Sequence, residues 1–215
     1  MLTCQAIAGI CPPNAPYFCM TPEMAPQSEI KLSDFYQIPA YIISLHNVPV
    51  TLDAQWESPY LGMGMKDSKS MLIFGGTTRV QGMTKDAYAA AVCHELGHVL
   101  GGAPYQTING AQWSSAEGQA DFFAASVCLP RYFKSIGVKV SEIPARVENA
   151  GFKMLRSLAP HSSETSKELS SLIQSRFQEL DEVTESTLIN NYPSLKCRYE
   201  TFRNPIERSD CWFRE

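Results

Sequence analysis

The sequence predicts an α+β domain in which a small mixed sheet packs on one central helix, followed by a helical C-terminal part. Apolar, β-branched segments at residues 40–52 and 70–74 are typical of strands. From residue 84 onward, alanine-rich and amphipathic segments have the spacing of helices. The first of these helices carries the pattern H-E-x-x-H at residues 94–98, on which the functional interpretation depends.

Composition narrows the class of protein. The 215 residues, with 44% hydrophobic and 19% charged content, fit one globular domain with a core of ordinary size. A net charge of -4 gives no electrostatic reason to expect nucleic acid or an anionic membrane as a partner. The most apolar stretch, residues 38–52, is interrupted by His46, Asn47 and Pro49, so no membrane span is expected.

An N-terminal arm is predicted at residues 1–29. It is rich in proline and contains Cys4, Cys11 and Cys19, but it has little helix or strand character. We expect cysteines to hold such an arm through disulfides. Residues 30–215 are expected to form a single domain.

The seven cysteines of the chain favour an oxidising compartment. Cys197 and Cys211 bracket a short C-terminal segment, as a disulfide pair would. Cys93 is expected either to pack or to pair with a cysteine of another helix, for which Cys128 is the obvious candidate. We therefore expect a secreted or periplasmic protein whose signal peptide has been removed. The alternative that the number of cysteines leaves open is a cytosolic protein with buried thiols.

Strands and a short helix are expected before residue 75. Residues 32–36 have the character of a short helix, while residues 40–45 and 48–52 are rich in β-branched and aromatic residues and predict strands. Residues 70–74, SMLIF, predict another strand, which ends at Gly75-Gly76.

Two helices are expected next, joined by a polar loop. Thr84 has the character of an N-cap, and Gly101-Gly102 ends the first helix. The second helix is expected to start near Ser114 or Ser115 and to run to about Cys128, ending before Pro130. Further helices are expected at residues 144–158 and 165–190, and Asn109-Gly110 predicts a turn within the polar loop.

His94, Glu95 and His98 form the H-E-x-x-H pattern of the first helix. Residues four apart lie one above the other on a helix, so both imidazoles can ligate one divalent metal, with zinc as the expected ion. Glu95 then lies beside the ion, where it can act as a general base toward a bound water. This geometry predicts a zinc hydrolase.

A catalytic zinc site needs a third protein ligand and an open fourth position. A third histidine is excluded, because the extended pattern H-E-x-x-H-x-x-G-x-x-H would place it at Pro104. Glu117, in the second helix, is well placed to be the ligand. Asp121, one turn on, can then accept a hydrogen bond from a ligand imidazole and fix its tautomer. In the alternative, residues 114–117 form a capping box and Asp121 is the ligand.

HELGH followed by Glu117-Gly-Gln-Ala-Asp121 resembles the gluzincin zinc metallopeptidases, and is most similar to the HtpX and CAAX prenyl protease superfamily. Residues 191–198, NYPSLKCR, are similar to the late H-P…R element of that family, with Tyr192 where histidine is usual. The resemblance covers residues 70–128 and, less closely, 190–200. It implies a zincin-like fold and the hydrolysis of peptide bonds. Because no transmembrane helices are expected, it implies a soluble, exported relative that acts on proteins or peptides.

The late element also supplies candidates for stabilising the transition state. Negative charge that develops on the scissile carbonyl needs a donor beside the metal. Arg198 and Tyr192 are candidates from the resemblance, and His161 or Tyr105 from chemistry alone. Arg198 could equally form a structural salt bridge with one of the two acidic residues of the second helix.

A zinc-dependent endopeptidase is therefore the predicted function, with His94, His98 and Glu117 as ligands and Glu95 as base. One alternative is a non-catalytic zinc-containing binding module. Another is a metal-dependent hydrolase that acts on cell-wall peptide or another amide.

In zinc peptidases the strand ahead of the active helix usually pairs with an extended substrate, so residues 70–74 are either such an edge or an ordinary buried strand. An arm cysteine could also bind the metal as a latency ligand.

Overall fold

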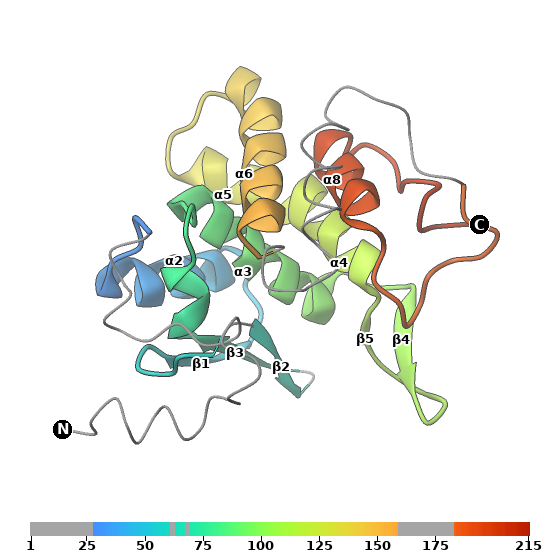
Figure 1. The fold of residues 1–215 in the computed structure, drawn as a ribbon, viewed down its shortest axis with the longest axis horizontal. Helices are drawn as coiled ribbons and strands as arrows, with labels where there is room; N and C mark the ends of the chain where they lie inside the picture. Colours follow the sequence, from blue (N-terminus) through green and yellow to red (C-terminus); the bar gives the residue numbers. More distant parts are fainter. Residues whose placement is uncertain (1–27, 61–62, 68, 159–182) are drawn as a thin grey trace.

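The computed structural model describes residues 28–60, 63–67, 69–158 and 183–215. The fold is α+β, as predicted: the helices pack together, and a three-stranded sheet lies along one side of them (Figure 1). A separate two-stranded hairpin extends from the other end of the same side (Figure 1). Of the predicted N-terminal arm, residues 1–27 lie outside the described residues.

Helix α2 spans Leu32–Leu45 and replaces both the short helix and the strand expected there. The strand predicted at residues 40–45 is wrong. Phe35, Ile38 and Ile42 are buried at helical spacing. Burial of this apolar stripe therefore outweighs the strand preference of the β-branched residues.

The three-stranded sheet is mixed, as predicted, and its order is β1-β3-β2. β1 (Thr51–Gln55) pairs in parallel with β3 (Ser70–Phe74), and β2 (Met63–Asp67) pairs antiparallel with β3. β1 begins three residues after the start of the strand expected at residues 48–52. The strand expected at residues 70–74 is confirmed as β3.

β3 is the central strand of this sheet, and Met71 and Ile73 are fully buried. A substrate cannot pair with it, because both of its sides are already occupied by β1 and β2. Of the two interpretations of residues 70–74, the ordinary buried strand is therefore confirmed.

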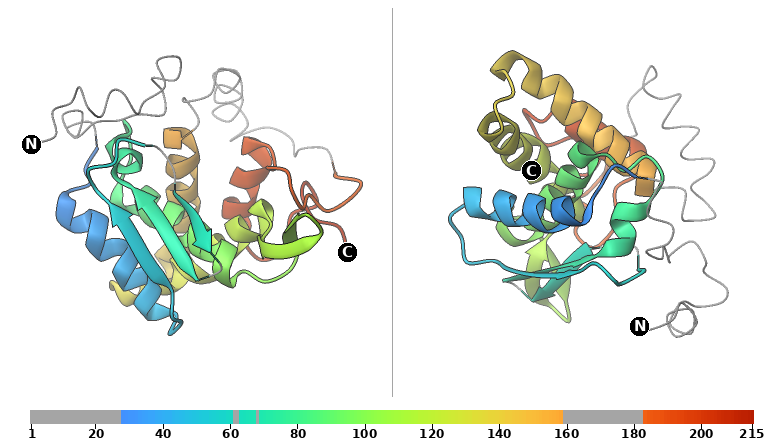
Figure 2. Two further views of the ribbon diagram at one scale, coloured as in Figure 1. Left: turned by 90° about the horizontal axis from the view of Figure 1, so that it is seen from below. Right: turned by 90° about the vertical axis from the view of Figure 1, so that its left-hand side faces the viewer.

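Helix α3 spans Lys85–Leu100 and begins where the sequence predicts. The Thr84 hydroxyl accepts a hydrogen bond from the N–H of Ala87 at 3.1 Å, which caps the helix. Residues 87–94 are all buried, because the sheet lies on one side of α3 and α6 (Ile143–Leu158) on the other (Figure 2). The helix that carries the H-E-x-x-H residues is thus buried along most of its length.

A β-hairpin replaces the polar loop expected between the two helices. β4 (Tyr105–Ile108) pairs antiparallel with β5 (Ala111–Ser115). The turn residues Asn109-Gly110 both have positive φ, at 51° and 80°, as the Asn-Gly sequence favours in a two-residue hairpin. Ser114-Ser115 therefore end a strand, so the helix start predicted there is wrong and the helix begins at Glu117.

Three helical segments follow one another without a break: α4 (Glu117–Phe123), a π-helical turn (Ala124–Cys128) and α5 (Leu129–Ser135). The end predicted before Pro130 is wrong. The proline stands in the first turn of α5, where its missing N–H is tolerated, and the wide π turn precedes it.

The C-terminal part is helical, as predicted, in much of its described length. α6 matches the helix expected at residues 144–158, and α8 (Leu195–Arg203) carries part of the late element. Of the helix expected at residues 165–190, residues 165–182 lie outside the described residues and residues 183–190 contain no helix.

Two disulfides hold these elements together. Cys93 in α3 pairs with Cys128 at the end of the π turn, and Cys197 in α8 pairs with Cys211, as expected. The adjacent Trp212 is fully buried. Among the described residues, no helix has both the length and the apolar character needed to cross a membrane.

Candidate metal centre

Helices α3 and α4 bring His94, His98 and Glu117 together. Nε2 of His94 lies 3.3 Å from Oε2 of Glu117, and Nε2 of His98 lies 3.6 Å from Oε1 of the same carboxylate. The two imidazole rings stand edge to face, with their centroids 4.8 Å apart. All three side chains are more than nine-tenths buried. These residues form a group that could hold a metal ion, as the sequence predicts.

The second nitrogen of each imidazole is held by a specific acceptor. Nδ1 of His94 lies 2.8 Å from Oδ1 of Asp121, and Nδ1 of His98 lies 2.8 Å from the backbone oxygen of Ser115. A carbonyl can only accept, so Nδ1 of His98 must carry a proton, and the ionised Asp121 requires the same of His94. When it is neutral, each imidazole therefore presents the lone pair of its Nε2 toward Glu117.

Asp121 is itself fixed by Arg198 from α8. Nε and Nη2 of the guanidinium donate to the two carboxylate oxygens at 2.7 and 3.0 Å, so the pair is bidentate. The Asp121 side chain is fully buried. Burial alone would raise the pKa of Asp121, but Arg198 and His94 lower it. The salt bridge anticipated as one role for Arg198 is thus present.

Glu117 is the group's acidic member, and it does not serve as a helix cap. The N-cap of α4 is Ala116, which makes no side-chain cap hydrogen bond, and Glu117 is the first helical residue. Burial alone would raise the pKa of Glu117, but the contacts with His94 and His98 lower it. The capping box considered for residues 114–117 is therefore not formed.

A further neighbour of Glu117, Gln106, was not predicted from the sequence. Its Nε2 donates to Oε1 of Glu117 at 3.1 Å from strand β4. Oε2 of Glu117 is buried and has no hydrogen-bond partner among the described residues. In the sequence, the Asn109-Gly110 turn could have indicated this contact. A hairpin through that turn pairs Gln106 with Ser114, which lies just ahead of α4.

Glu95 and Tyr192 lie next to the group. Burial raises the pKa of Glu95, although His94 and His98 act in the opposite direction. Tyr192 is 67% exposed overall, yet its ring lies 5.6 Å from the Arg198 guanidinium. Partial burial and the nearby Glu117 carboxylate raise the pKa of its hydroxyl. Of the other donors considered, Tyr105 lies on β4 and His161 lies outside the described residues.

The distances between the nitrogens and oxygens of His94, His98 and Glu117 suit a cation bound between them. Two Nε2 lone pairs and one carboxylate converge at 3.3 and 3.6 Å, and such acceptors repel one another unless a proton or a metal lies between them. Ligands about 2.0–2.1 Å from a tetrahedral zinc ion are separated by about 3.3–3.4 Å, close to these distances. Without a metal, burial would lower the pKa of His94, but Asp121 and Glu117 raise it to about 10.

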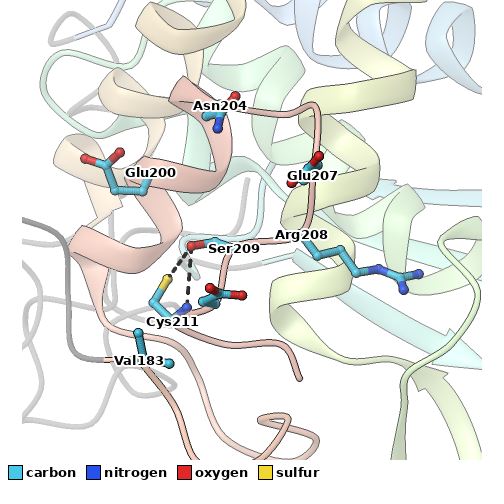
Figure 3. A pocket seen from close by; sticks show the side chains of 8 residues that line it. Val183, Glu200, Asn204, Glu207, Arg208, Ser209 and Cys211 are labelled. Atoms are coloured by element: carbon cyan, nitrogen blue, oxygen red, sulfur yellow. Dashed lines mark hydrogen bonds between the residues drawn. The ribbon is translucent and has the colours of Figure 1, made fainter. Parts of the chain in front are cut away.

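A cavity elsewhere in the molecule does not contribute to this group. It has a volume of about 240 Å³ and lies between α8 and the C-terminal segment (Figure 3). Glu200, Glu207 and Asp210 line it, and the Ser209 hydroxyl lies 2.9 Å from the sulfur of the disulfide-bonded Cys211. None of its lining residues belongs to the His94, His98 and Glu117 group.

The candidate centre is thus built by three elements: α3 supplies the imidazoles, α4 the carboxylates, and α8 the guanidinium that holds Asp121. Comparison with models of known protein families, with curated proteins and with solved structures finds no match to this chain.

Proposed function

We propose that this protein is a zinc-dependent endopeptidase of the gluzincin type, with a zincin-like fold. One observation carries the proposal: the buried Nε2 atoms of two imidazoles converge with a buried carboxylate, while Asp121 and the Ser115 carbonyl each hold the Nδ1 atom of one of these imidazoles. Two histidines and one glutamate leave a fourth coordination place for water, which is the arrangement of catalytic rather than structural zinc.

When bound, zinc supplies a Lewis acid that polarises the scissile carbonyl and lowers the pKa of water in the open place. Glu95 acts as general base: it takes a proton from the attacking water and passes it to the leaving amine. The raised pKa of its carboxyl group suits this role, because a carboxylate that holds a proton more tightly is a stronger base.

Tyr192 is the group best placed to donate to the developing oxyanion. Its hydroxyl lies close enough to Glu117 to be influenced by it, on the side of the centre formed by the C-terminal segment. Arg198, the other candidate, acts through Asp121, because Nε and Nη2 are both engaged by that carboxylate. Arg198 is then a positioning residue that holds Asp121, which in turn orients His94.

The two disulfides indicate the cellular compartment in which the protein acts. Cys93–Cys128 and Cys197–Cys211 support a location outside the cytoplasm, since such bonds persist in oxidising compartments. We propose a secreted or periplasmic protein, with proteins or peptides as substrates.

Glu95→Gln tests the proposal. This change removes the base and keeps the size of the side chain, so hydrolysis of casein or of a peptide library is expected to be lost. Zinc content is expected to stay near one ion per chain, because Glu95 is not a ligand. Hydrolysis that survives the substitution would refute the role of Glu95. A wild-type protein that retains zinc and cleaves nothing would favour the non-catalytic module.

A further inference from the structure

Gln106 approaches the candidate centre from outside both of the helices that form it. Its Nε2 lies 3.1 Å from Oε1 of Glu117, and the ionised carboxylate can only accept, so the amide must donate. Oε2, the other oxygen, faces Nε2 of His94 at 3.3 Å and has no hydrogen-bond partner among the described residues. Oε1 also faces an imidazole, Nε2 of His98 at 3.6 Å, so the two oxygens differ in one respect: Oε1 accepts a hydrogen bond from Gln106 and Oε2 accepts none from the described residues.

The hairpin that carries Gln106 is anchored on both strands. On β4, the N–H of Thr107 donates to Oδ1 of Asn190 at 2.9 Å, and Nδ2 of Asn190 donates back to the Thr107 hydroxyl at 3.2 Å. On β5, the Ser115 hydroxyl donates to the carbonyl of Gly102 at 2.8 Å. Gln106 is adjacent to the first of these anchors, so its backbone position is determined by contacts outside the centre.

A carboxylate can bind a metal through one oxygen or through both. Binding through both oxygens would fill an additional coordination place and reduce the room for water. A donor that holds one oxygen favours binding through the other, and such partners of metal ligands typically change metal affinity by about 10-fold to 100-fold when they are removed.

We infer that Gln106 is a positioning residue that holds Oε1 of Glu117, so that this carboxylate binds the metal through Oε2 alone and the fourth coordination place stays open. The inference rests on the proposed function, because it concerns the same metal group. It extends that function by assigning a role to the β4–β5 hairpin, which the H-E-x-x-H and E-x-x-x-D motifs do not include.

Gln106→Met tests the inference, because it removes the donor and nearly preserves the length of the side chain. Gln106→Leu repeats the test with a branched side chain. Gln112→Leu is the matched control, since Gln112 lies on β5 of the same hairpin and is exposed. Two properties are measured: the zinc dissociation constant, by competition with a chelating dye, and the visible absorption spectrum of the cobalt-substituted protein, which reports coordination number.

We expect both Gln106 variants to bind zinc about 10-fold to 100-fold more weakly than wild type. Their cobalt spectra should weaken in intensity, as expected when a carboxylate binds through two oxygens and raises the coordination number. The Gln112 variant should match wild type in both properties. Unchanged zinc affinity and an unchanged cobalt spectrum in Gln106→Met would overturn the inference. Neither measurement uses hydrolysis, so a failure of the peptidase proposal in the Glu95→Gln experiment would be recognised separately.

Discussion

Gly97 of α3 lies directly against the backbone of Ala120 in α4. A β-carbon on Gly97 would come within 2.6 Å of the Ala120 carbonyl oxygen and 2.8 Å of its α-carbon. The two helices therefore approach so closely here that no side chain larger than that of glycine fits at position 97. Glu117 and Asp121, on either side of Ala120, are brought within reach of His94 by this close approach.

Gly97→Ala is expected to separate the two helices. A methyl group cannot be accommodated at 2.6 Å from a carbonyl oxygen, so α4 must move, and overpacking of this kind lowers the free energy of unfolding by about 1–3 kcal/mol. Zinc affinity should fall as well, because Glu117 moves with α4. Chemical denaturation and zinc titration measure the two effects. Val99→Ala, two residues further along α3, adds no atoms and should leave zinc affinity unchanged; equal affinity in the Gly97 variant would contradict the prediction.

Tyr192→Phe is expected to lower kcat by roughly 100-fold to 1,000-fold, as when one donor to an oxyanion is removed. KM and zinc content should stay near the wild-type values, because the ring and its contact with Arg198 are kept. Steady-state kinetics on a fluorogenic peptide provides the measurement. Tyr105→Phe is the matched control from the hairpin, and a loss of kcat in that variant alone would assign the donor to Tyr105 instead.

The residues of the centre that follow from local geometry could be predicted from the sequence. His94 and His98 share a helix face because they are four residues apart, and Glu117 and Asp121 are related in the same way. The sequence also indicated the bond between Asp121 and a ligand imidazole. Arg198 was foreseen as a partner of an acidic residue, although the choice between Asp121 and Glu117 required the position of α8.

The features that were missed depend on contacts between distant segments. Gln106 reaches Glu117 only because residues 105–115 form a hairpin, and the neighbouring anchor comes from Asn190, 83 residues away from Thr107. Residues 40–45 were predicted as a strand from their β-branched composition, but the burial of Ile42 and Ile43 against the core selects a helix. In both cases contacts between distant segments, and not the local preference of the residues for helix or strand, determined the structure.

Zinc binding is expected to release a proton at neutral pH. Without metal the pKa of His94 is about 10, so Nε2 carries a proton at pH 7 that must leave before the nitrogen can ligate. Apparent zinc affinity should therefore rise with pH up to about pH 10. Titration calorimetry in two buffers with different ionisation enthalpies measures the released proton. An observed enthalpy that is the same in both buffers would contradict this prediction.

The metal-free protein should show the opposite dependence on pH in its stability. The pKa of His94 is raised from 6.5 to about 10 on folding, so its contribution is fully present below pH 6.5 and is lost as the pH rises toward 10. Thermal unfolding of the chelator-treated protein from pH 6 to pH 10 should show a falling Tm. Saturating zinc should reverse much of this fall, because the metal replaces the proton between Nε2 and Glu117.

The Cys93–Cys128 disulfide closes a segment that contains all three proposed ligands, His94, His98 and Glu117. Cross-linking residues separated by 35 positions restricts the unfolded chain, so the double variant Cys93→Ala/Cys128→Ala should be less stable by about 4 kcal/mol. Cys197→Ala/Cys211→Ala, with a separation of 14, should be less stable by about 3 kcal/mol. Saturating zinc should raise the free energy of unfolding equally in the first variant and in wild type, because the metal binds the folded state and the disulfide acts on the unfolded one. A smaller zinc increment in that variant would show that the disulfide also sets the distance between α3 and α4.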